Sequence, residues 1–411
     1  MRVLIVTQYF WPESFRINDL ATGLQLRGHD VTVLTGMPNY PAGKLFSGYG
    51  YFPRRERRDE IDIIRVPLVP RGKSKGLRLL ANYASYALSA SMLGPWLSRK
   101  QFDVILCYEP SPVTVALPAL VMKRLSGAPL LFWVQDLWPE TLAATKAVRS
   151  TGMLKLVGWF VRFVYRRCER VLVQSRAFID HVAAQGVTAE QVRYFPNSAE
   201  SFYRSFEPTD DATEGLELPR GFRIVFAGNM GVGQSIDTIL AAAELLRAES
   251  DVQWILLGDG RERDRIRAEI ARRGLERTVH LLGSRPAESM PHYFAAADVL
   301  LATLKREPVF ALTIPSKIQS YLACGRPILA ALDGEGARVI VEAEAGVVGP
   351  ADDSQSLARN ALKLRAMSSE ARAMLGRNGR AYFDAHFDSA SLLDQLEGWM
   401  TEVTEERRCA A

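Results

Sequence analysis

A lysine at the start of a predicted helix has the surroundings that point most directly to chemistry. The stretch TIPSKIQSYLACGRP, residues 313–327, places Pro and Ser before a helical run that a glycine closes, and Ser316 and Gln319 have capping-box spacing. The amides and positive end of such a helix attract anions. Because first helical turns favour acids, Lys317 there predicts a bound diphosphate. The alternative is a capped surface helix with an incidental lysine.

Two glycine-rich turns in the same half of the chain are candidates for the same ligand. GNMGVGQ, residues 228–234, follows an apolar run, and LGDGR, residues 257–261, follows another. Backbone amides at strand-to-helix turns approach phosphates. Neither turn has the G-x-G-x-x-G spacing of a dinucleotide site, which argues against a dehydrogenase. Each has a purely steric explanation when taken singly, but together with the lysine helix they converge on one end of one predicted sheet.

The elements that must position these residues alternate between short apolar runs and helical segments, which is typical of βαβ units and parallel sheets. The cycle begins at residues 3–7, pauses in the polar stretch after residue 197 and restarts at residues 223–227. This predicts two doubly wound domains. The expected parts are an N-terminal acceptor-binding domain over residues 1–200, a linker over 201–221, a C-terminal donor domain over 222–385, and a helix over 386–411 that can cross back to the first domain.

Composition excludes several classes of protein. A chain of 411 residues that is 48% hydrophobic and has no low-complexity tract suits two globular domains with a cleft. Its four cysteines are widely spaced and lack a C-x-x-C pair, so neither a disulfide framework nor a zinc site is expected. The N-terminal apolar run is too short for a signal peptide. We therefore expect a cytoplasmic protein.

Charge divides the chain unevenly. Residues 1–200 carry 26 Lys and Arg against 15 Asp and Glu, whereas residues 201–411 carry 25 against 31. A basic N-terminal half suggests an anionic partner, either nucleic acid or a membrane surface. Residues 79–98 contain no charge and follow a basic stretch. A membrane span, a buried helix and an interfacial helix all remain open for this segment.

Several motifs together resemble a retaining glycosyltransferase of family four, over nearly the whole chain. They include YFWPE at residues 9–13, LRGHDV at 26–31, FPN at 195–197, and the two glycine turns. More narrowly, QDLWPE at 135–140 and PSK-x-QSYLA-x-G at 315–325 resemble the branch that includes colanic-acid and N-acetylfucosamine transferases of bacterial surface polysaccharides.

The resemblance implies the GT-B fold, with two Rossmann-like parallel-sheet domains facing a cleft. It implies transfer of a sugar, such as an N-acetylated hexosamine or deoxysugar, from a nucleotide donor, with a UDP-sugar expected. The acceptor would be polyprenyl-diphosphate-linked or another glycan of O-antigen, lipopolysaccharide, capsule or exopolysaccharide synthesis. The enzyme would be peripheral at the inner face of the cytoplasmic membrane and would not bind nucleic acid. No Asp-x-Asp occurs, so no metal or other cofactor is expected.

The resemblance assigns the donor to the C-terminal half. In the family, an arginine and a lysine stand at the positions of Asn229 and Gln234, and two glutamates stand at Leu312 and Ser320. These departures leave Lys317 and Arg261 as the cations for the diphosphate. The donor candidates are Gly228, Asn229, Gly231, Gln234, Gly258, Gly260, Arg261, Pro315, Ser316, Lys317, Gln319 and Ser320.

The catalytic candidates are Asp136, Glu140 and Lys317. The resemblance implies that the transferred sugar keeps its anomeric configuration through front-face attack. In such an attack the leaving phosphate oxygen takes the acceptor proton, so no protein base is required. Asp136 and Glu140 would then orient acceptor hydroxyls or the donor sugar. Equally open for Asp136 is a role as the N-cap of a following helix. The acceptor candidates are Glu13, Arg16, Glu109 and Asp136.

Two other functional classes remain open. A nucleotide-sugar epimerase shares the two-domain arrangement and needs no acceptor. A non-catalytic protein that binds nucleotide sugars is compatible with the missing family glutamates.

Overall fold

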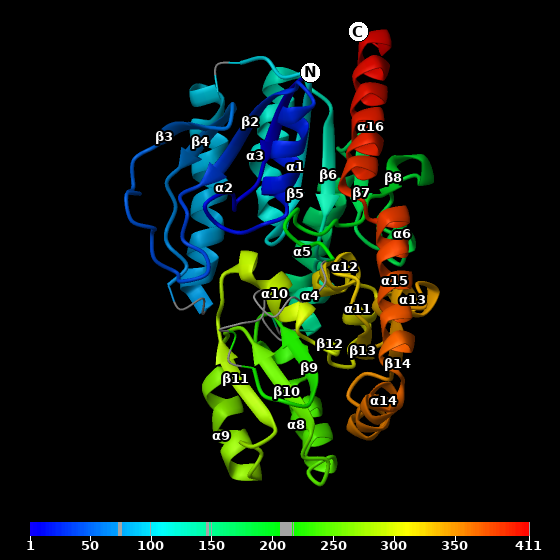
Figure 1. The fold of residues 1–411 in the computed structure, drawn as a ribbon. Coiled ribbons are helices and arrows are strands. Elements are labelled where there is room, and N and C mark those ends of the chain that lie inside the picture. The colour runs from blue at the N-terminus through cyan, green and yellow to red at the C-terminus, as the bar shows by residue number, and fades with distance from the viewer. Residues whose placement is uncertain are drawn as a thin grey trace. The chain divides into compact units, whose positions relative to one another are not determined.

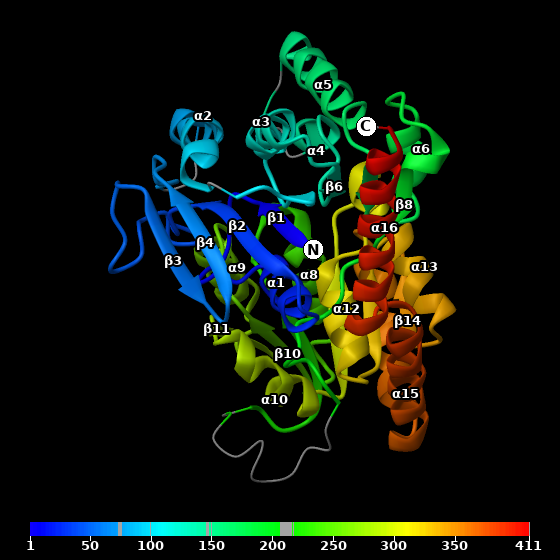
Figure 2. The same ribbon diagram turned by 90° about the horizontal axis from the view of Figure 1, so that it is seen from above.

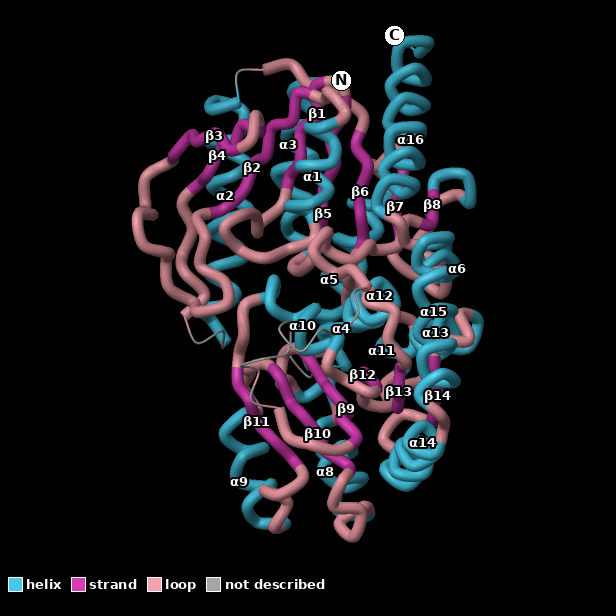
Figure 3. Tube along the Cα trace, viewed as in Figure 1, coloured by secondary structure: helices cyan, strands magenta, loops and turns pink. Residues whose placement is uncertain are grey.

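The chain forms two compact units in the computed structural model, which describes residues 1–72, 76–98, 100–144, 148, 150–205, 216 and 218–410 (Figure 1). Unit 1 comprises Met1–Pro196 and Ser389–Ala411, and unit 2 comprises Asn197–Asp388. Helices and strands alternate along most of each unit (Figure 3). Each unit is described by itself.

Unit 1 is built on an eight-stranded sheet with the order β3-β4-β2-β1-β5-β6-β7-β8. All neighbours are parallel except β3 and β4, which are antiparallel. The apolar runs form the central strands because both of their faces are covered. The strands are β1 (Arg2–Val6), β2 (Asp30–Gly36), β3 (Arg54–Arg58), β4 (Ile61–Val66), β5 (Val104–Glu109), β6 (Leu130–Val134), β7 (Arg170–Val173) and β8 (Val192–Tyr194).

The helices of unit 1 cover both faces of this sheet. Helices α2, α3 and α5 lie on one face, and α1 and α16 lie on the other (Figure 2). Alternation along β6 agrees, because Trp133 shares a core with α16 while its neighbour Phe132 contacts Tyr165 of α5. The helices are α1 (Ile17–Leu26), α2 (Gly76–Ser98), η1 (Val113–Val115), α3 (Ala116–Ser126), α4 (Glu140–Ala144), α5 (Thr151–Tyr165), α6 (Phe178–Ala183), η2 (Ala189–Gln191) and α16 (Ser389–Ala410).

The terminal helix α16 completes the core of unit 1. Its Leu396 and Met400 are fully buried in the same cluster as Leu20 and Leu24 of α1. Ion pairs surround this contact: Arg27 with Asp394 and Glu397, His29 with Glu397, and Arg170 with Glu402 and Glu406. Acids of α16 therefore neutralise part of the basic charge of residues 1–196. Unit 1 as a whole still carries 28 Lys and Arg against 19 Asp and Glu, a net charge of +9.

Helix α2 settles part of the question about the uncharged segment. It buries Asn82, Tyr86, Ala90 and Gly94 on one side and leaves apolar side chains exposed on the other. Among the described residues, no helix is long and apolar enough to cross a membrane. The segment is therefore half-buried.

Unit 2 is built on a six-stranded parallel sheet with the order β11-β10-β9-β12-β13-β14. The chain starts in β9 and adds strands first on one side and then on the other, so the order reverses between β9 and β12. Its strands are β9 (Phe222–Ala227), β10 (Val252–Leu257), β11 (Val279–Gly283), β12 (Val299–Thr303), β13 (Ile328–Ala331) and β14 (Gly346–Gly349).

Helices separate these strands. They are η3 (Val232–Gln234), α8 (Ile236–Leu245), α9 (Arg263–Arg273), η4 (Ala287–Ser289), α10 (Met290–Ala295), α11 (Pro308–Ala311), α12 (Ser316–Ala323), α13 (Glu335–Glu342), α14 (Ser354–Ala366) and α15 (Ser369–His386). From residue 354 to residue 410 the chain forms three helices, with breaks after residues 366 and 386.

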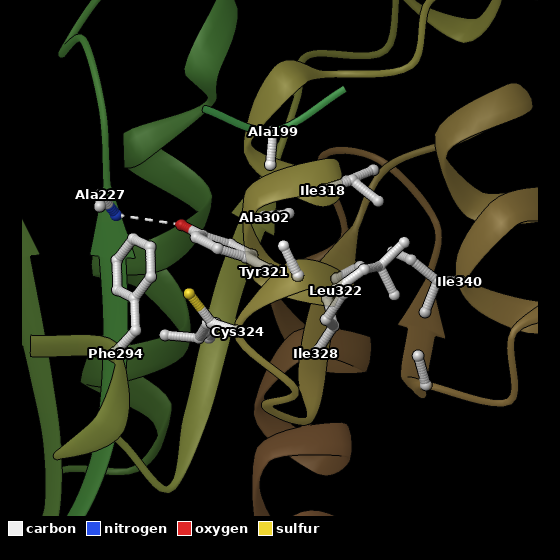
Figure 4. Packing of buried hydrophobic residues seen from close by; sticks show 14 of the residues in the cluster. Ala199, Ala227, Phe294, Ala302, Ile318, Tyr321, Leu322, Cys324, Ile328 and Ile340 are labelled. Carbon is white, nitrogen blue, oxygen red and sulfur yellow. Dashed lines mark hydrogen bonds between the residues drawn. The ribbon is translucent and has the colours of Figure 1, made fainter. Parts of the chain in front are cut away.

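The buried hydroxyl of Tyr321 separates β9 from β12 at the switch in strand order (Figure 4). The two strands pair only at Ile224 with Val299 and at Val225 with Leu300. Beyond these pairs the hydroxyl accepts from the amide of Ala227 at 3.2 Å and donates to the carbonyl of Leu301 at 3.2 Å. Strand ends that diverge at such a switch point are where open α/β sheets bind ligands.

Candidate functional site

The amino group of Lys317 lies at the diverging ends of β9 and β12. Its Nζ atom donates to Oε1 of Gln234 at 2.6 Å and lies 3.7 Å from the centre of the Phe226 ring. Among the described residues no carboxylate forms an ion pair with it, and burial lowers the pKa of this half-buried amine to about 7. The structure thus places here a basic group that no carboxylate among the described residues pairs with.

Gln234 holds this amine in place. Its backbone carbonyl accepts from Oγ1 of Thr303 at 2.5 Å, and the amide of Lys305 donates to the carbonyl of Gly233 at 2.9 Å. These bonds tie η3 to the end of β12. The family resemblance expects a lysine at position 234, and here an amine from α12 reaches that position instead. A basic group is therefore present at this place, although it comes from a different element.

The predicted capping box of α12 is wrong. Pro315 is the N-cap, no side chain caps the helix, and Ser316 is the first helical residue. Gln319 is fully buried, and neither of its side-chain amide atoms has a hydrogen-bond partner among the described residues. Ser320, at the position of a family glutamate, donates back to the carbonyl of Ser316 at 3.4 Å. A proline at the N-cap has no side-chain acceptor, so the first amides of α12 receive no cap from it.

The two glycine turns pack backbone against backbone. A Cβ atom on Gly258 would lie 1.9 Å from the carbonyl oxygen of Gly228, and one on Gly260 would lie 2.5 Å from that of Met230. The amide of Met230 also donates to the carbonyl of Asp259 at 2.8 Å. Glycine is therefore required sterically, as the alternative explanation held, and this contact fixes the turn that follows β9.

The remaining donor candidates lie around these turns. Asn229 is exposed, and its side chain lies next to Gly231 and Gly260. Arg261 is also exposed, on the segment before α9. The neighbouring Arg263 forms an ion pair with Asp259 at 3.4 Å. Of the two candidate basic residues, Lys317 is thus held at the strand ends, whereas Arg261 lies exposed between β10 and α9.

Two carboxylates meet at the carboxyl ends of β5 and β6 in unit 1. Burial, together with the nearby Asp136 carboxylate, raises the pKa of Glu109 well above its usual value. Burial also raises the pKa of Asp136 to about 7. Glu109 is only 1% exposed and Asp136 is half-buried, so Asp136 is the member of the pair that solvent reaches. Burial thus favours the protonated form of both carboxyl groups.

Glu140 forms its own contact with a histidine. Its Oε1 atom is 3.2 Å from Nε2 of His181 on α6. Burial opposes ionisation of Glu140, but His181 outweighs it and the pKa is lowered; the pKa of His181 is raised by the same contact. Helix α4 begins at Glu140, which puts its N-cap at position 139; Asp136 lies three residues before that position, so the N-cap alternative is wrong.

Glu13, in the first loop of unit 1, binds the backbone of the loop that follows β2. Oε1 of Glu13 accepts from the amides of Asn39 and Tyr40 at 2.7 Å each, while the buried Oε2 has no hydrogen-bond partner in the part of the chain that the structure describes. Burial raises the pKa of this carboxyl to about 7. Arg16 precedes α1 at its N-cap position. Glu13 thus holds the loop after β2.

Sequence reasoning missed two residues that shape the donor-side site. Phe226 lies under the amine of Lys317, and Thr303 anchors Gln234. Both belong to apolar strand runs, so nothing in their local sequence distinguishes them from core residues. Their position at strand ends was the available signal.

Comparisons with known proteins agree with the resemblance. Residues 14–198 match the family described as glycosyl transferase 4-like domain, and residues 221–366 match glycosyl transferases group 1. The putative colanic acid biosynthesis glycosyl transferase WcaI of Escherichia coli is 25% identical over 337 residues, covering 79% of this chain and 82% of its own.

Solved structures share the fold over the full length. Sucrose-phosphate synthase from Thermosynechococcus elongatus has a TM-score of 0.75 at 18% identity and covers 100% of both chains. Anabaena Alr3699/HepE in complex with UDP-glucose has a TM-score of 0.69 at 19% identity and covers 98% of this chain and 100% of its own. The two parallel-sheet units, the two family matches and these structures together identify the chain as a retaining glycosyltransferase of family four, group 1, with the GT-B fold.

Proposed function

We propose that this glycosyltransferase takes an N-acetylated hexosamine or deoxysugar from a UDP-sugar, whose diphosphate binds Lys317. The observation that carries the proposal is the uncompensated amine at the divergent ends of β9 and β12. A diphosphate there would meet the amine, the start of α12 and the amides of the turn at Gly228–Gly231. The structure of HepE with UDP-glucose supports a UDP donor in this fold.

The acceptor in this proposal is a polyprenyl-diphosphate-linked or other glycan of bacterial surface polysaccharide synthesis. The similarity to WcaI supports this class of pathway. Asp136 would orient an acceptor hydroxyl, because it is the solvent-reached carboxyl of its pair and has a pKa near 7. Glu140 would act indirectly, since His181 already engages it.

A panel of nucleotide sugars tests the donor. Thermal unfolding of the full chain is followed with UDP-, GDP-, dTDP- and ADP-sugars, and we expect UDP-sugars to raise the melting temperature most. Stabilisation by GDP-sugars alone would overturn the choice of nucleotide. The best donor is then incubated with and without lipid-linked glycans. Sugar isomerised without an acceptor would instead support an epimerase, and binding without transfer would support a non-catalytic protein.

The proposed place of action is an anionic membrane surface, which unit 1 would contact through α2, α3 and α5. The exposed stripe of α2 is apolar throughout, with Leu88 64%, Met92 75% and Trp96 66% exposed. On α5, Trp159 is 57% exposed and stacks on Phe163. These helices lie on one face of the sheet (Figure 2). Soluble proteins rarely leave so much apolar surface uncovered.

Charge on the same face favours anionic lipid as the occupant. Helices α2, α3 and α5 contain five basic residues and not one Asp or Glu. The guanidinium of Arg167, just beyond α5, lies 3.6 Å from the centre of the Phe163 ring. Basic side chains around an apolar stripe are the pattern of helices that lie in a membrane interface.

Flotation tests this membrane contact. Vesicles with about 30% phosphatidylglycerol should capture the full chain at about 0.1 M salt and release part of it at about 0.5 M. Met92→Asp should weaken capture, whereas Leu245→Asp should not, because Leu245 is a similarly exposed apolar residue on α8 of unit 2. No capture of the unmodified chain at low salt would remove the membrane contact and leave the donor proposal untouched.

A further inference from the structure

A second uncompensated cation, Arg71, lies in unit 1 beyond the ends of β1, β2 and β4. Its guanidinium carbon lies 5.6 Å, 5.0 Å and 6.0 Å from the ring centres of Tyr9, Tyr40 and Tyr83. Tyr9 in turn stacks on Phe15, with ring centres 5.0 Å apart and planes 8° apart. The tyrosines come from three separate segments, so the fold assembles an aromatic cage around one arginine.

Buried amides fix the position of this arginine. The backbone amide of Arg71 donates to Oδ1 of Asn39 at 3.0 Å, and Nδ2 of Asn82 donates to the carbonyl of Val69 at 2.6 Å. Nε2 of Gln8 donates to Oδ1 of Asn82 at 2.8 Å. All three amide side chains are fully buried. A network of this kind makes the loop rigid, because each buried amide needs its partners in place.

The arginine has donors to spare and no counter-charge. Nη1 donates to the hydroxyl of Tyr9 at 3.0 Å, but Nε is buried without a partner, and within the described ranges no carboxylate forms an ion pair with Arg71. Oε1 of Glu13, an acid of the neighbouring loop, is occupied by two backbone amides, and burial raises the pKa of this carboxyl to about 7. By contrast, Arg65 on β4 is paired with Glu56.

We propose that Arg71 binds a phosphate group of the acceptor. A guanidinium with unused donors fits a phosphate in a bidentate manner, and the charge that no protein carboxylate neutralises would be neutralised by the ligand. The tyrosine rings supply apolar walls for the part of the acceptor next to that phosphate. This inference rests on the proposed transfer to a lipid-linked acceptor, and it replaces Glu13 with Arg71 as the contact to the acceptor in the first loop.

Calorimetry on the full chain tests the site, with its donor site filled by the nucleotide chosen in the thermal panel. The probes are geranyl diphosphate, geraniol and inorganic phosphate, which separate phosphate recognition from binding of the apolar chain. We expect geranyl diphosphate to bind and geraniol not to bind. Arg71→Gln should weaken binding about 10- to 100-fold, the range for a lost charge-assisted hydrogen bond. Arg55→Gln, which removes the same charge from an exposed site on β3, should change it less than about twofold.

Arg71→Lys guards against a folding defect, since it keeps the charge but not the planar fork and should recover part of the affinity. Equal binding by the unmodified chain and Arg71→Gln, or equal binding of geraniol and geranyl diphosphate, overturns the proposal. If the unmodified chain transfers sugar and the Arg71→Gln variant has the same acceptor KM, this site is overturned and the proposed function stands. Binding of geranyl diphosphate that depends on Arg71, in a chain that transfers no sugar, would support this site and overturn the proposed function.

Discussion

The amine of Lys317 should make donor binding depend on pH in a way that few phosphate sites do. Burial lowers its pKa to about 7 in the free protein. If the diphosphate binds the ammonium form, a rise from pH 6 to pH 8 reduces that form about tenfold, and donor affinity should fall about tenfold, equivalent to about 1.4 kcal/mol. The diphosphate of a nucleotide sugar stays fully ionised over this range, so the dependence would report the protein.

Two variants isolate the cause. Lys317→Arg keeps a permanent charge and should bind the donor with little change between pH 6 and pH 8. Lys317→Met removes the charge-assisted hydrogen bond, worth about 1.5–3 kcal/mol, and should weaken the donor about 10- to 100-fold at pH 6. Calorimetry in two buffers of different ionisation enthalpy should detect proton uptake on binding at pH 8 by the unmodified chain alone.

A pH-independent donor affinity in the unmodified chain would refute the reasoning, and so would an equal slope in Lys317→Arg. Stability supplies an independent check with a defined sign. The folded pKa of Lys317 lies below its unfolded value of about 10.4, so this group makes the free protein more stable as pH rises from about 7. Lys317→Met should lose that part of the pH dependence, which urea unfolding measures.

Three further outcomes follow from the structure. Gly258→Ala should lower stability by at least about 1–2 kcal/mol and weaken donor binding, because φ is +133° and the new Cβ would meet Gly228; unchanged urea unfolding would contradict this. The raised pKa of Glu13 means that the unmodified chain loses stability as pH rises through about 7. The free energy of unfolding of Glu13→Gln, taken relative to that of the unmodified chain, should therefore be higher at pH 8 than at pH 5; the same relative value at both pH values would contradict this. Leu396→Ala should cost about 2–5 kcal/mol in thermal unfolding, unless α16 is detached from unit 1.

The doubly wound architecture was predictable because buried parallel strands are near-continuous apolar runs. β1 and β9 are examples, and both were expected from the sequence. β3 was missed because its sequence, RRERR, is charged, as suits an exposed edge strand. β8 was missed because it has only three residues. Pairing with a neighbour defines such strands, and pairing has no local signature in the sequence.

The candidate site was predictable only in part. Lys317 could be singled out because a cation in a first helical turn conflicts with helix statistics. Its contacts with Gln234 and Phe226 join segments about 80 and 90 residues away along the chain, so no local pattern encodes them. Arg71 was visible only as one of several basic residues. Its lack of a carboxylate partner is a property of the folded chain.

Because α16 packs in unit 1, the two units complete their folding in a set order during synthesis. The ribosome makes β1 to β8 first, but Leu392, Leu396, Met400 and Val403 belong to the core of the same unit and are made last. Unit 2 has all of its strands and helices earlier and can fold while α1 still lacks its partner. The first unit to emerge is therefore the last to be finished, and a chain that stops before residue 389 leaves it with an open hydrophobic face.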